Sequence, residues 1–186
     1  MSALIQDLLI LSQGIDGFAS DESVNFNLEN LFKPFIHDYS EKARSRNLRF
    51  SSKISADIPQ SLNGRLVPLL TVLNKLIDNA FKFTEVGEIA LSIELKHQDE
   101  EGLVLFFHLS DTSLGMSSSD FQRYSQAFTQ ADMSHTRRYG GAGIGLSVCR
   151  HILNSVGSNI RVEDDDQPGT RISFDFPFKL SDQEMS

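Results

Sequence analysis

Apolar residues recur at helical spacing in some segments of this chain and alternate as in strands in others, and the order of the two patterns indicates the fold class. Helical spacing is found in three segments after the N-terminal region: Leu28 to about Arg46, about Val67 to Phe83, and about 145–156. Strand patterns occupy residues 50–58, 87–97, 103–110, 159–164 and 170–178. Helices and strands in this order predict an α+β fold, a two-layer sandwich in which helices cover one face of a sheet.

The N-terminal region carries a shorter helical pattern of its own. Apolar residues from Leu4 to Leu11 lie at helical spacing with no capping residue before them, and Gly14 and Gly17 end the pattern. A helix without a cap is typical of the end of a longer helix. We therefore expect residues 1–16 to be such a helix end, 17–27 a linker with a possible short strand, 28–180 one domain and 181–186 a frayed tail.

Composition excludes several classes of protein. The 186 residues include 17 Lys and Arg against 25 Asp and Glu, a formal charge of −8, which argues against a general nucleic-acid binder. The single cysteine, Cys149, excludes an internal disulfide framework and a cysteine-rich zinc site. No apolar run approaches the ~20 residues of a membrane span, and no signal peptide is recognisable. These observations predict a soluble cytoplasmic domain.

Two short polar segments are candidates for ligand binding. Asn79 and Lys82 are three residues apart on the helical segment from about Val67 to Phe83, so they share a helix face, where an amide oxygen and a cation suit a metal ion and the phosphates that it bridges. Asp111 follows an apolar strand and precedes a glycine turn at Gly115, so its carboxylate is placed to accept from an exocyclic amine. An exposed polar face and a plain Asx turn are the alternatives.

A third segment is rich in glycine. Four glycines fall in the six positions Gly140–Gly145, directly before a helix, where the backbone can approach a ligand and free N–H groups can face a phosphate. A hinge for the polar segment 115–142, which is long enough to be a functional lid, is the alternative. No Gly-Lys-Ser/Thr follows, so the segment is not a Walker loop. The polar residues from Asp132 to Tyr139 exclude the buried first strand of a dinucleotide site.

Taken together, these motifs resemble the catalytic ATP-binding domain of sensor histidine kinases, the GHKL or Bergerat-type fold, and most closely that of hybrid sensor kinases. The resemblance rests on five segments in order: Asn79–Phe83, Asp111–Gly115, Phe128–Asp132, Gly141–Gly145 and Gly169-Thr170. It implies a mixed, mostly antiparallel sheet covered on one face by three helices, with an ATP lid. It also implies that residues 1–16 are the C-terminal end of the dimerisation and phosphoacceptor helix and that residues 28–180 are the catalytic ATP-binding domain. The implied function is transfer of the γ-phosphoryl group of ATP to a histidine in a two-component phosphorelay, with ATP and Mg²⁺ as cofactors.

The resemblance also implies roles for individual residues. Asn79 would ligate Mg²⁺, Asp111 would accept from the adenine amine, and Thr170 would lie beside the adenine. Lys82 and Arg138 are the candidates for stabilising phosphate charge, and Phe121 and Phe128 would anchor the lid. The implied nucleotide-binding residues are Lys75, Asn79, Lys82, Phe83, Asp111, Gly115, Met116, Phe128, Arg137, Arg138, Tyr139, Gly141, Gly143, Ile144, Gly145, Leu146 and Thr170.

Two positions depart from the family's pattern. Lys75 stands where the family usually has asparagine, one helical turn before Asn79, and lysine donates hydrogen bonds but cannot ligate a metal. It either repels Mg²⁺, neutralises phosphate directly, or extends outward and changes little. Ser113 stands where the family usually has glycine; if the backbone there needs a positive φ, serine costs about 1 kcal/mol.

The phosphoacceptor and the partners are expected outside this sequence. His37, followed by Asp38, is read as a surface histidine, so the acceptor would lie upstream of Met1. The implied partners are the dimerisation and phosphoacceptor domain, a receiver domain or response regulator, and another histidine kinase, within a homodimeric parent anchored in the inner membrane. A degenerate regulatory domain that acts by binding a partner kinase is the alternative. An ATPase of the gyrase or Hsp90 kind is set aside, because Lys75 cannot activate water.

Overall fold

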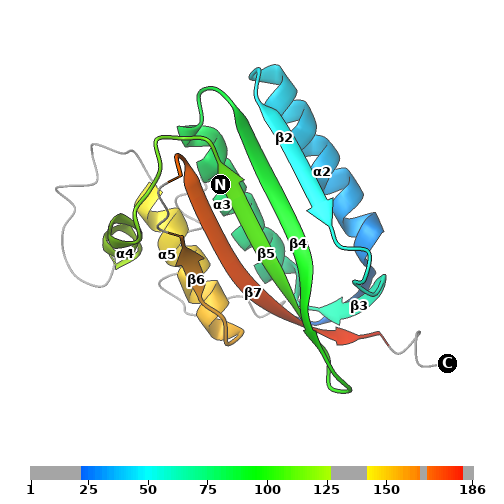
Figure 1. Ribbon diagram of the computed structural model, residues 1–186. Coiled ribbons are helices and arrows are strands. Elements are labelled where there is room, and N and C mark those ends of the chain that lie inside the picture. Colours follow the sequence, from blue (N-terminus) through cyan, green and yellow to red (C-terminus); the bar gives the residue numbers. More distant parts are fainter. Residues whose placement is uncertain (1–21, 127–141, 164–166, 182–186) are drawn as a thin grey trace.

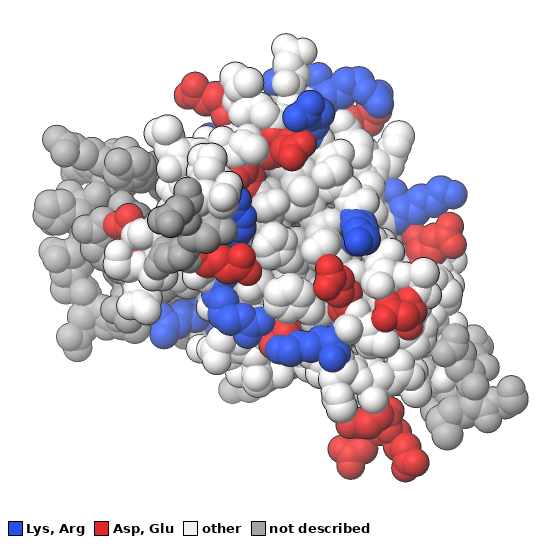
Figure 2. Space-filling view, viewed as in Figure 1, with Lys and Arg blue, Asp and Glu red and all other residues white. Residues whose placement is uncertain are grey.

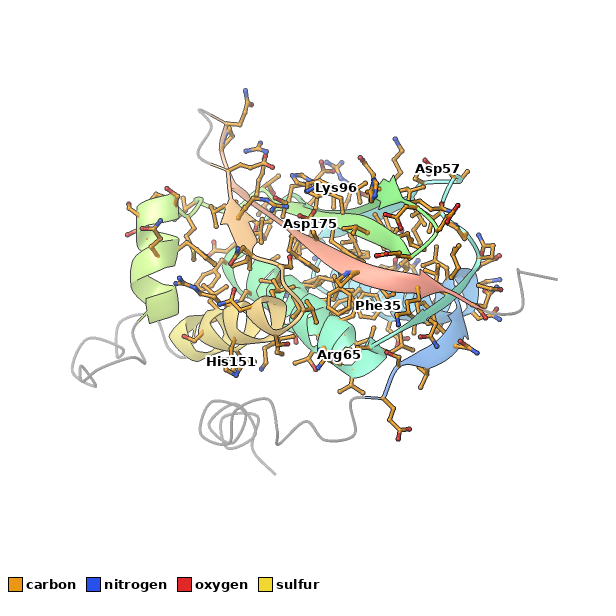
Figure 3. The ribbon with its side chains drawn as sticks, turned by 90° about the horizontal axis from the view of Figure 1, so that it is seen from below. Phe35, Asp57, Arg65, Lys96, His151 and Asp175 are labelled. Atoms are coloured by element: carbon orange, nitrogen blue, oxygen red, sulfur yellow. The ribbon has the colours of Figure 1, made fainter. Side chains whose placement is uncertain are left out.

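The computed structural model describes residues 22–126, 142–163 and 167–181. They form a two-layer sandwich in which one sheet is covered on one face by helices (Figure 1). The expected α+β class, with three helices on one face, is confirmed. In Figure 3 the central strands lie above α3 and α5, and Phe35 lies between the two layers.

The sheet has seven strands in the order β1-β3-β7-β5-β4-β2, with β6 paired to β7. Its strands are β1 (Val24–Asn27), β2 (Arg49–Ile54), β3 (Ser61–Gly64), β4 (Glu88–Gln98), β5 (Leu103–Asp111), β6 (Ile160–Val162) and β7 (Thr170–Leu180). All pairings are antiparallel except that of β2 with β4, which is parallel. The sheet is therefore mixed and mostly antiparallel, as expected.

The described helices are α2 (Leu28–Ser45), α3 (Leu66–Phe83), α4 (Ser118–Gln126) and α5 (Ala142–Ser155). The α2 helix begins where the Asn27 side chain accepts from the backbone N–H of Asn30 at 2.9 Å, a side-chain cap that satisfies one otherwise unpaired donor. The α3 helix is the most apolar and buries Val72, Leu73, Leu76 and Ile77 against the sheet.

Three elements differ from the sequence prediction. The α4 helix lies in the segment 115–142 that was read as a loop, and β3 was not predicted at all. The α5 helix begins at Ala142, three residues before its predicted start. The N-terminal region 1–21 and the tail 182–186 lie outside the described residues, so the helix end, most of the linker and the frayed tail stay predictions.

The core lies between the sheet and the helices α2, α3 and α5. Strand alternation supplies one half of it, since the buried apolar residues of β5 and β7 lie on the helix side: Leu103, Leu105, Phe107, Leu109, Ile172, Phe174, Phe176 and Phe178. The rings of Phe107 and Phe174 stack at a centroid distance of 4.9 Å across the central strand pair. This pairing holds β5 and β7 in register, and their ends carry the site residues.

The outer face of the sheet carries no described helix. Figure 2 shows this face with positive and negative side chains interspersed. Asp175 on β7 lies between two cations there, 2.8 Å from Lys96 Nζ and 3.2 Å from an Arg161 nitrogen. Lys96 and Asp175 lie together on this side in Figure 3, whereas Arg65 and His151 lie on the helix side.

Candidate nucleotide site

The candidate site lies at the end of the sheet where β5 finishes and β7 starts, near α4 and α5 (Figure 1). Asp111, the last residue of β5, is the register partner of Thr170, the first residue of β7. One oxygen of the Asp111 carboxylate, Oδ1, accepts from the backbone N–H of Ser113 at 2.9 Å and from that of Thr170 at 3.3 Å. These two bonds fix the carboxylate and leave the second oxygen, Oδ2, to accept from a ligand.

Two glycines bring the loops around Asp111 into contact. Gly115 has φ +90, and a Cβ there would lie 2.9 Å from the carbonyl oxygen of Gly169. Gly169 has φ +103, and its Cβ would lie 1.9 Å from the carbonyl oxygen of Asp111. Only glycine meets both conditions at these two positions. Gly115 was predicted as a site residue, whereas Gly169 was noted only as part of Gly-Thr; a glycine directly before a strand is the signal that marks it.

Ser113 does not have the backbone that the sequence analysis considered. Among the described non-glycine residues only Asn47 has a positive φ, so the strain cost at Ser113 does not apply. Its hydroxyl oxygen instead lies 3.2 Å from the Thr170 hydroxyl and accepts from the Gly115 N–H at 3.3 Å. The serine therefore joins the loop to the start of β7.

A neighbouring threonine anchors the same loop on its other side. Thr112 Oγ1 accepts from the Glu88 N–H at 3.0 Å and donates to the Val86 carbonyl at 3.1 Å. Gly87, with φ +116, makes room for it, since a Cβ there would lie 2.0 Å from Thr112 Oγ1. The segment between α3 and β4 is thus tied to the loop that follows Asp111.

The α3 helix presents its predicted residues on one face beside the start of α5. Lys75, Asn79 and Lys82 follow one another at intervals of four and three residues. Lys75 and Asn79 are half-buried and Lys82 is exposed, with its Nζ 5.3 Å from the centre of the half-buried Phe83 ring. A Cβ on Gly145 would lie 3.9 Å from Asn79 Nδ2, so the first turn of α5 lies against Asn79.

The N-terminal turn of α5 completes the arrangement. Its first residues, which include Gly143 and Ile144, leave backbone N–H groups without partners inside the helix, the usual setting for a phosphate. Leu146 is buried in the core and holds the helix in place, and Met116 is half-buried against the same core. Phe121 on α4 is buried as well, and its role as an anchor of the lid stays a prediction.

The structure thus brings together residues from α3, β5, β7 and α5 that are spread over almost a hundred positions. Five predicted site residues, Phe128, Arg137, Arg138, Tyr139 and Gly141, lie outside the described residues, so their roles stay predictions. Within the described part of the chain, no helix is long and apolar enough to cross a membrane.

Comparison with known proteins identifies the family. Residues 64–180 match the family model of histidine kinase-, DNA gyrase B- and HSP90-like ATPases. The sensor protein GacS of Pseudomonas syringae pv. syringae is 31% identical over an alignment of 186 positions, which covers 99% of this chain and 20% of GacS. The signal transduction histidine-protein kinase BarA of Escherichia coli K12 is 30% identical over 178 residues, 96% of this chain and 19% of BarA. The chain thus spans about a fifth of the length of these relatives.

Solved structures agree on the fold. Full-length ShkA in complex with AMPPNP superposes with a TM-score of 0.67 at 23% identity, over 86% of this chain and 32% of that one. The catalytic domain of the histidine kinase ThkA superposes with a TM-score of 0.65 at 21% identity, over 86% and 99% of the two chains. The chain belongs to the family of histidine kinase-, DNA gyrase B- and HSP90-like ATPases.

Proposed function

We propose that this chain is the ATP-binding catalytic domain of a hybrid sensor histidine kinase. The observation that carries the proposal is the convergence of two kinds of binding group at one site. A carboxylate fixed through one oxygen at Asp111 suits a base with an exocyclic amine, and Asn79 beside a helix N-terminus suits phosphates. These are the two ends of an adenine nucleotide.

The donor set fits a magnesium ion that is carried by the nucleotide. The described residues contain no group of three or more His, Cys, Asp or Glu side chains that could hold a metal alone. The amide oxygen of Asn79 is a ligand that Mg²⁺ accepts, and Mg²⁺ commonly completes its shell with water and substrate phosphates. The ion would neutralise phosphate charge there, together with Lys75 and Lys82 on the same helix face.

The reaction would be phosphoryl transfer to a histidine on another domain. Among the described residues, His37 is exposed on α2, His97 pairs with Asp99, and His108 lies 3.8 Å from Glu163 on the open sheet face. None of these three lies at the site, and the fourth, His151, lies nearer the end of α5 than its first turn. The chain itself would bind and orient ATP and neutralise its charge, which accounts for most of catalysis in this class of reaction. The acceptor would come from a dimerisation domain of a homodimeric, membrane-anchored parent, and a receiver domain would take the phosphoryl group next.

Calorimetric titration with ADP and with a non-hydrolysable ATP analogue, each with Mg²⁺ and with EDTA, tests the nucleotide site. We expect binding that Mg²⁺ strengthens by about tenfold or more, and we expect Asn79→Ala to remove that difference, since it deletes the metal ligand. Asn154→Ala is the matched control, because it removes the same side chain from an exposed position near the end of α5, away from the first turn that lies against Asn79. Absence of nucleotide binding would contradict the proposal.

One observation favours a second function, a regulatory domain that binds a partner kinase. Lys75 places a cation one helical turn from the proposed metal ligand, and a lysine there disfavours Mg²⁺. Nucleotide binding that is weak and indifferent to Mg²⁺ would support this alternative. Labelling of a separate dimerisation and phosphoacceptor domain by radioactive ATP, lost in Asn79→Ala, would support the kinase.

A further inference from the structure

The strands at the edges of the sheet differ in length. β1 has four residues and β6 has three, whereas β2, the last strand beyond β4, has six. Figure 1 shows β2 as the outermost strand on the side of α2. It contains no proline, and its pairing with β4 has no bulge. Proline and bulges are devices that block an edge strand against pairing with another chain, so the edge of β2 is open to such pairing.

The backbone of β2 is bonded to β4 on one side. The pairing starts where the Arg49 N–H donates to the Gly87 carbonyl at 3.0 Å. Successive residues of an extended strand direct their N–H and C=O groups to opposite sides, so Phe50, Ser52 and Ile54 direct theirs away from β4. Among the described residues, no backbone hydrogen bond reaches these three. Three donors and three acceptors therefore line the free edge.

The side of this edge that faces the helices is apolar. The Phe50 ring lies 5.8 Å from that of Tyr39 on α2, so the side chains of Phe50, Ser52 and Ile54 point toward the helix layer. Phe50 and Ile54 pack against the core but are only half-buried, and Ser52 between them is exposed. A strand added at this edge would cover both apolar residues with every second side chain of its own.

The opposite side of the edge, on the open face of the sheet, carries two cations. Arg49 pairs with Glu88 at 3.3 Å, whereas Lys53 has no ion pair among the described residues. Pairing β2 with the β2 of a second copy would place four cations on one face of two adjacent strands, and like charges there are destabilising. The charge instead favours a strand whose side chains on this face are acidic.

We propose that the free edge of β2 binds an extended segment of a partner protein in which acidic and apolar residues alternate, as an added strand of the sheet. The backbone of the segment pairs with Phe50, Ser52 and Ile54, its acidic side chains face Lys53, and its apolar side chains cover Phe50 and Ile54. This edge shares no residue with the candidate nucleotide site, so its test does not depend on the proposed function.

The probe is a short synthetic peptide in which glutamate and valine alternate, and the readout is hydrogen exchange of the full chain followed by NMR. At a peptide concentration about ten times its dissociation constant, the N–H groups of Phe50, Ser52 and Ile54 should exchange about tenfold more slowly. The N–H of Arg49, which is already bonded to Gly87, should change little. A form of the peptide with an N-methylated backbone keeps the side chains but has no N–H donors, and it should not bind.

Two variants locate the contact. Ser52→Pro removes the central outward N–H and should weaken peptide binding by about tenfold or more, since an edge strand tolerates proline where its N–H faces solvent. Ser52→Ala, the matched control, keeps the N–H and should bind as the unmutated chain does. If Ser52→Pro does not fold, the exposed substitution Lys53→Glu serves: it should weaken the glutamate peptide by about threefold or more and favour a peptide of alternating lysine and valine.

Absence of peptide binding, equal binding of the N-methylated form, or slowed exchange only outside β2 would overturn the proposal. So would dimerisation of the free chain that slows exchange at the same three N–H groups, because a second copy would then be the occupant of the edge.

Discussion

At the scale of single residues, the two carboxylate oxygens of Asp111 have different roles. Oδ1 accepts from two backbone N–H groups, so Oδ2 is the oxygen that we propose accepts from the base. Because both N–H groups come from the backbone, side-chain changes at positions 113 and 170 leave this anchoring in place. The backbone thus fixes the orientation of the side chain at position 111. Because this side chain is a carboxylate, its second oxygen accepts hydrogen bonds and donates none.

Replacing this carboxylate by an amide has a predictable effect. The asparagine of Asp111→Asn must turn its NH₂ group either toward the Ser113 and Thr170 N–H groups or toward the adenine amine. In either orientation a hydrogen-bond donor faces another donor. We expect ADP affinity to fall by about tenfold or more and the preference for ADP over GDP to narrow. Calorimetry with both nucleotides measures this. Equal affinity of the unmutated domain for ADP and GDP would contradict the role of Asp111.

Gly169 makes a prediction about stability. Gly169→Ala adds a Cβ at φ +103 and 1.9 Å from a backbone oxygen, so the strand pair must shift. We expect a loss of about 2 kcal/mol or more in the free energy of unfolding, measured by urea denaturation. Gly157→Ala is the control: φ is +75 but nothing lies within 4 Å of its Cβ, and about 1 kcal/mol is expected. Equal losses of unfolding free energy in Gly169→Ala and Gly157→Ala would show that the close approach of the added Cβ to the Asp111 carbonyl oxygen does not destabilise the fold.

Part of this residue-level picture was predictable from sequence and part was not. Asp111, Gly115 and Thr170 lie within recognisable short motifs, and the family resemblance implied a mostly antiparallel sheet. The bond from Ser113 to Thr170 joins positions 57 residues apart, and no local pattern indicates it. The role of Lys75 was left open by sequence for a similar reason, because rotamer and neighbours decide what a lysine on a helix face contacts.

At the scale of elements, α2 and α3 are joined around Tyr39. Its hydroxyl donates to Asn74 Oδ1 at 2.7 Å, and its ring stacks on Phe81 at a centroid distance of 5.8 Å. Lys42 Nζ pairs with Asp78 at 2.6 Å across the same two helices. Asn74 and Asp78 directly precede Lys75 and Asn79, so this contact also sets the rotation of α3 about its axis.

The Tyr39 contact predicts a dependence of stability on alkaline pH. Burial, reinforced by the charge of Asp78, raises the pKa of Tyr39 well above its ordinary value. In the unfolded chain tyrosine ionises near pH 10, so the stabilisation is complete below that pH and declines by about 1.4 kcal/mol per pH unit above it. We expect Tyr39→Phe to be about 1 kcal/mol less stable at pH 8 and to lose this deficit by pH 11. Denaturation at both pH values measures this. A stability deficit of Tyr39→Phe that is the same at pH 8 and pH 11 would contradict the predicted pH dependence.

The elements that sequence analysis missed are short or polar. The β3 strand has four residues, too few for a pattern to be distinguished from a loop. The α4 helix has little apolar surface apart from the buried Phe121. A local signal was present, however: the Asp120 N–H bonds to Ser117 Oγ at 3.0 Å, and a serine with an acidic residue three positions later marks a helix start.

At the scale of the whole molecule, the proposed nucleotide site and the charged sheet face are on opposite sides of the sheet. The residues proposed to bind the nucleotide come from the helix layer and from the end of the β5–β7 pair, whereas Asp175 and its two cations lie on the open face. A ligand at the site would contact α3, β5, β7 and α5 together, and it would therefore oppose unfolding of both layers at once.

This arrangement predicts that nucleotide stabilises the whole domain and that the effect depends on the site alone. At a concentration a hundred times its dissociation constant, a ligand adds about 2.7 kcal/mol to the free energy of unfolding. For a domain of this size that corresponds to a rise in Tm of roughly 5–10 °C.

Asp111→Asn, at the same ADP concentration, should show a much smaller rise in Tm. Asp175→Asn should lower the starting Tm, because Lys96 and Arg161 lose their shared partner, yet show the full rise. An undiminished shift in Asp111→Asn would mean that nucleotide binds elsewhere on the molecule.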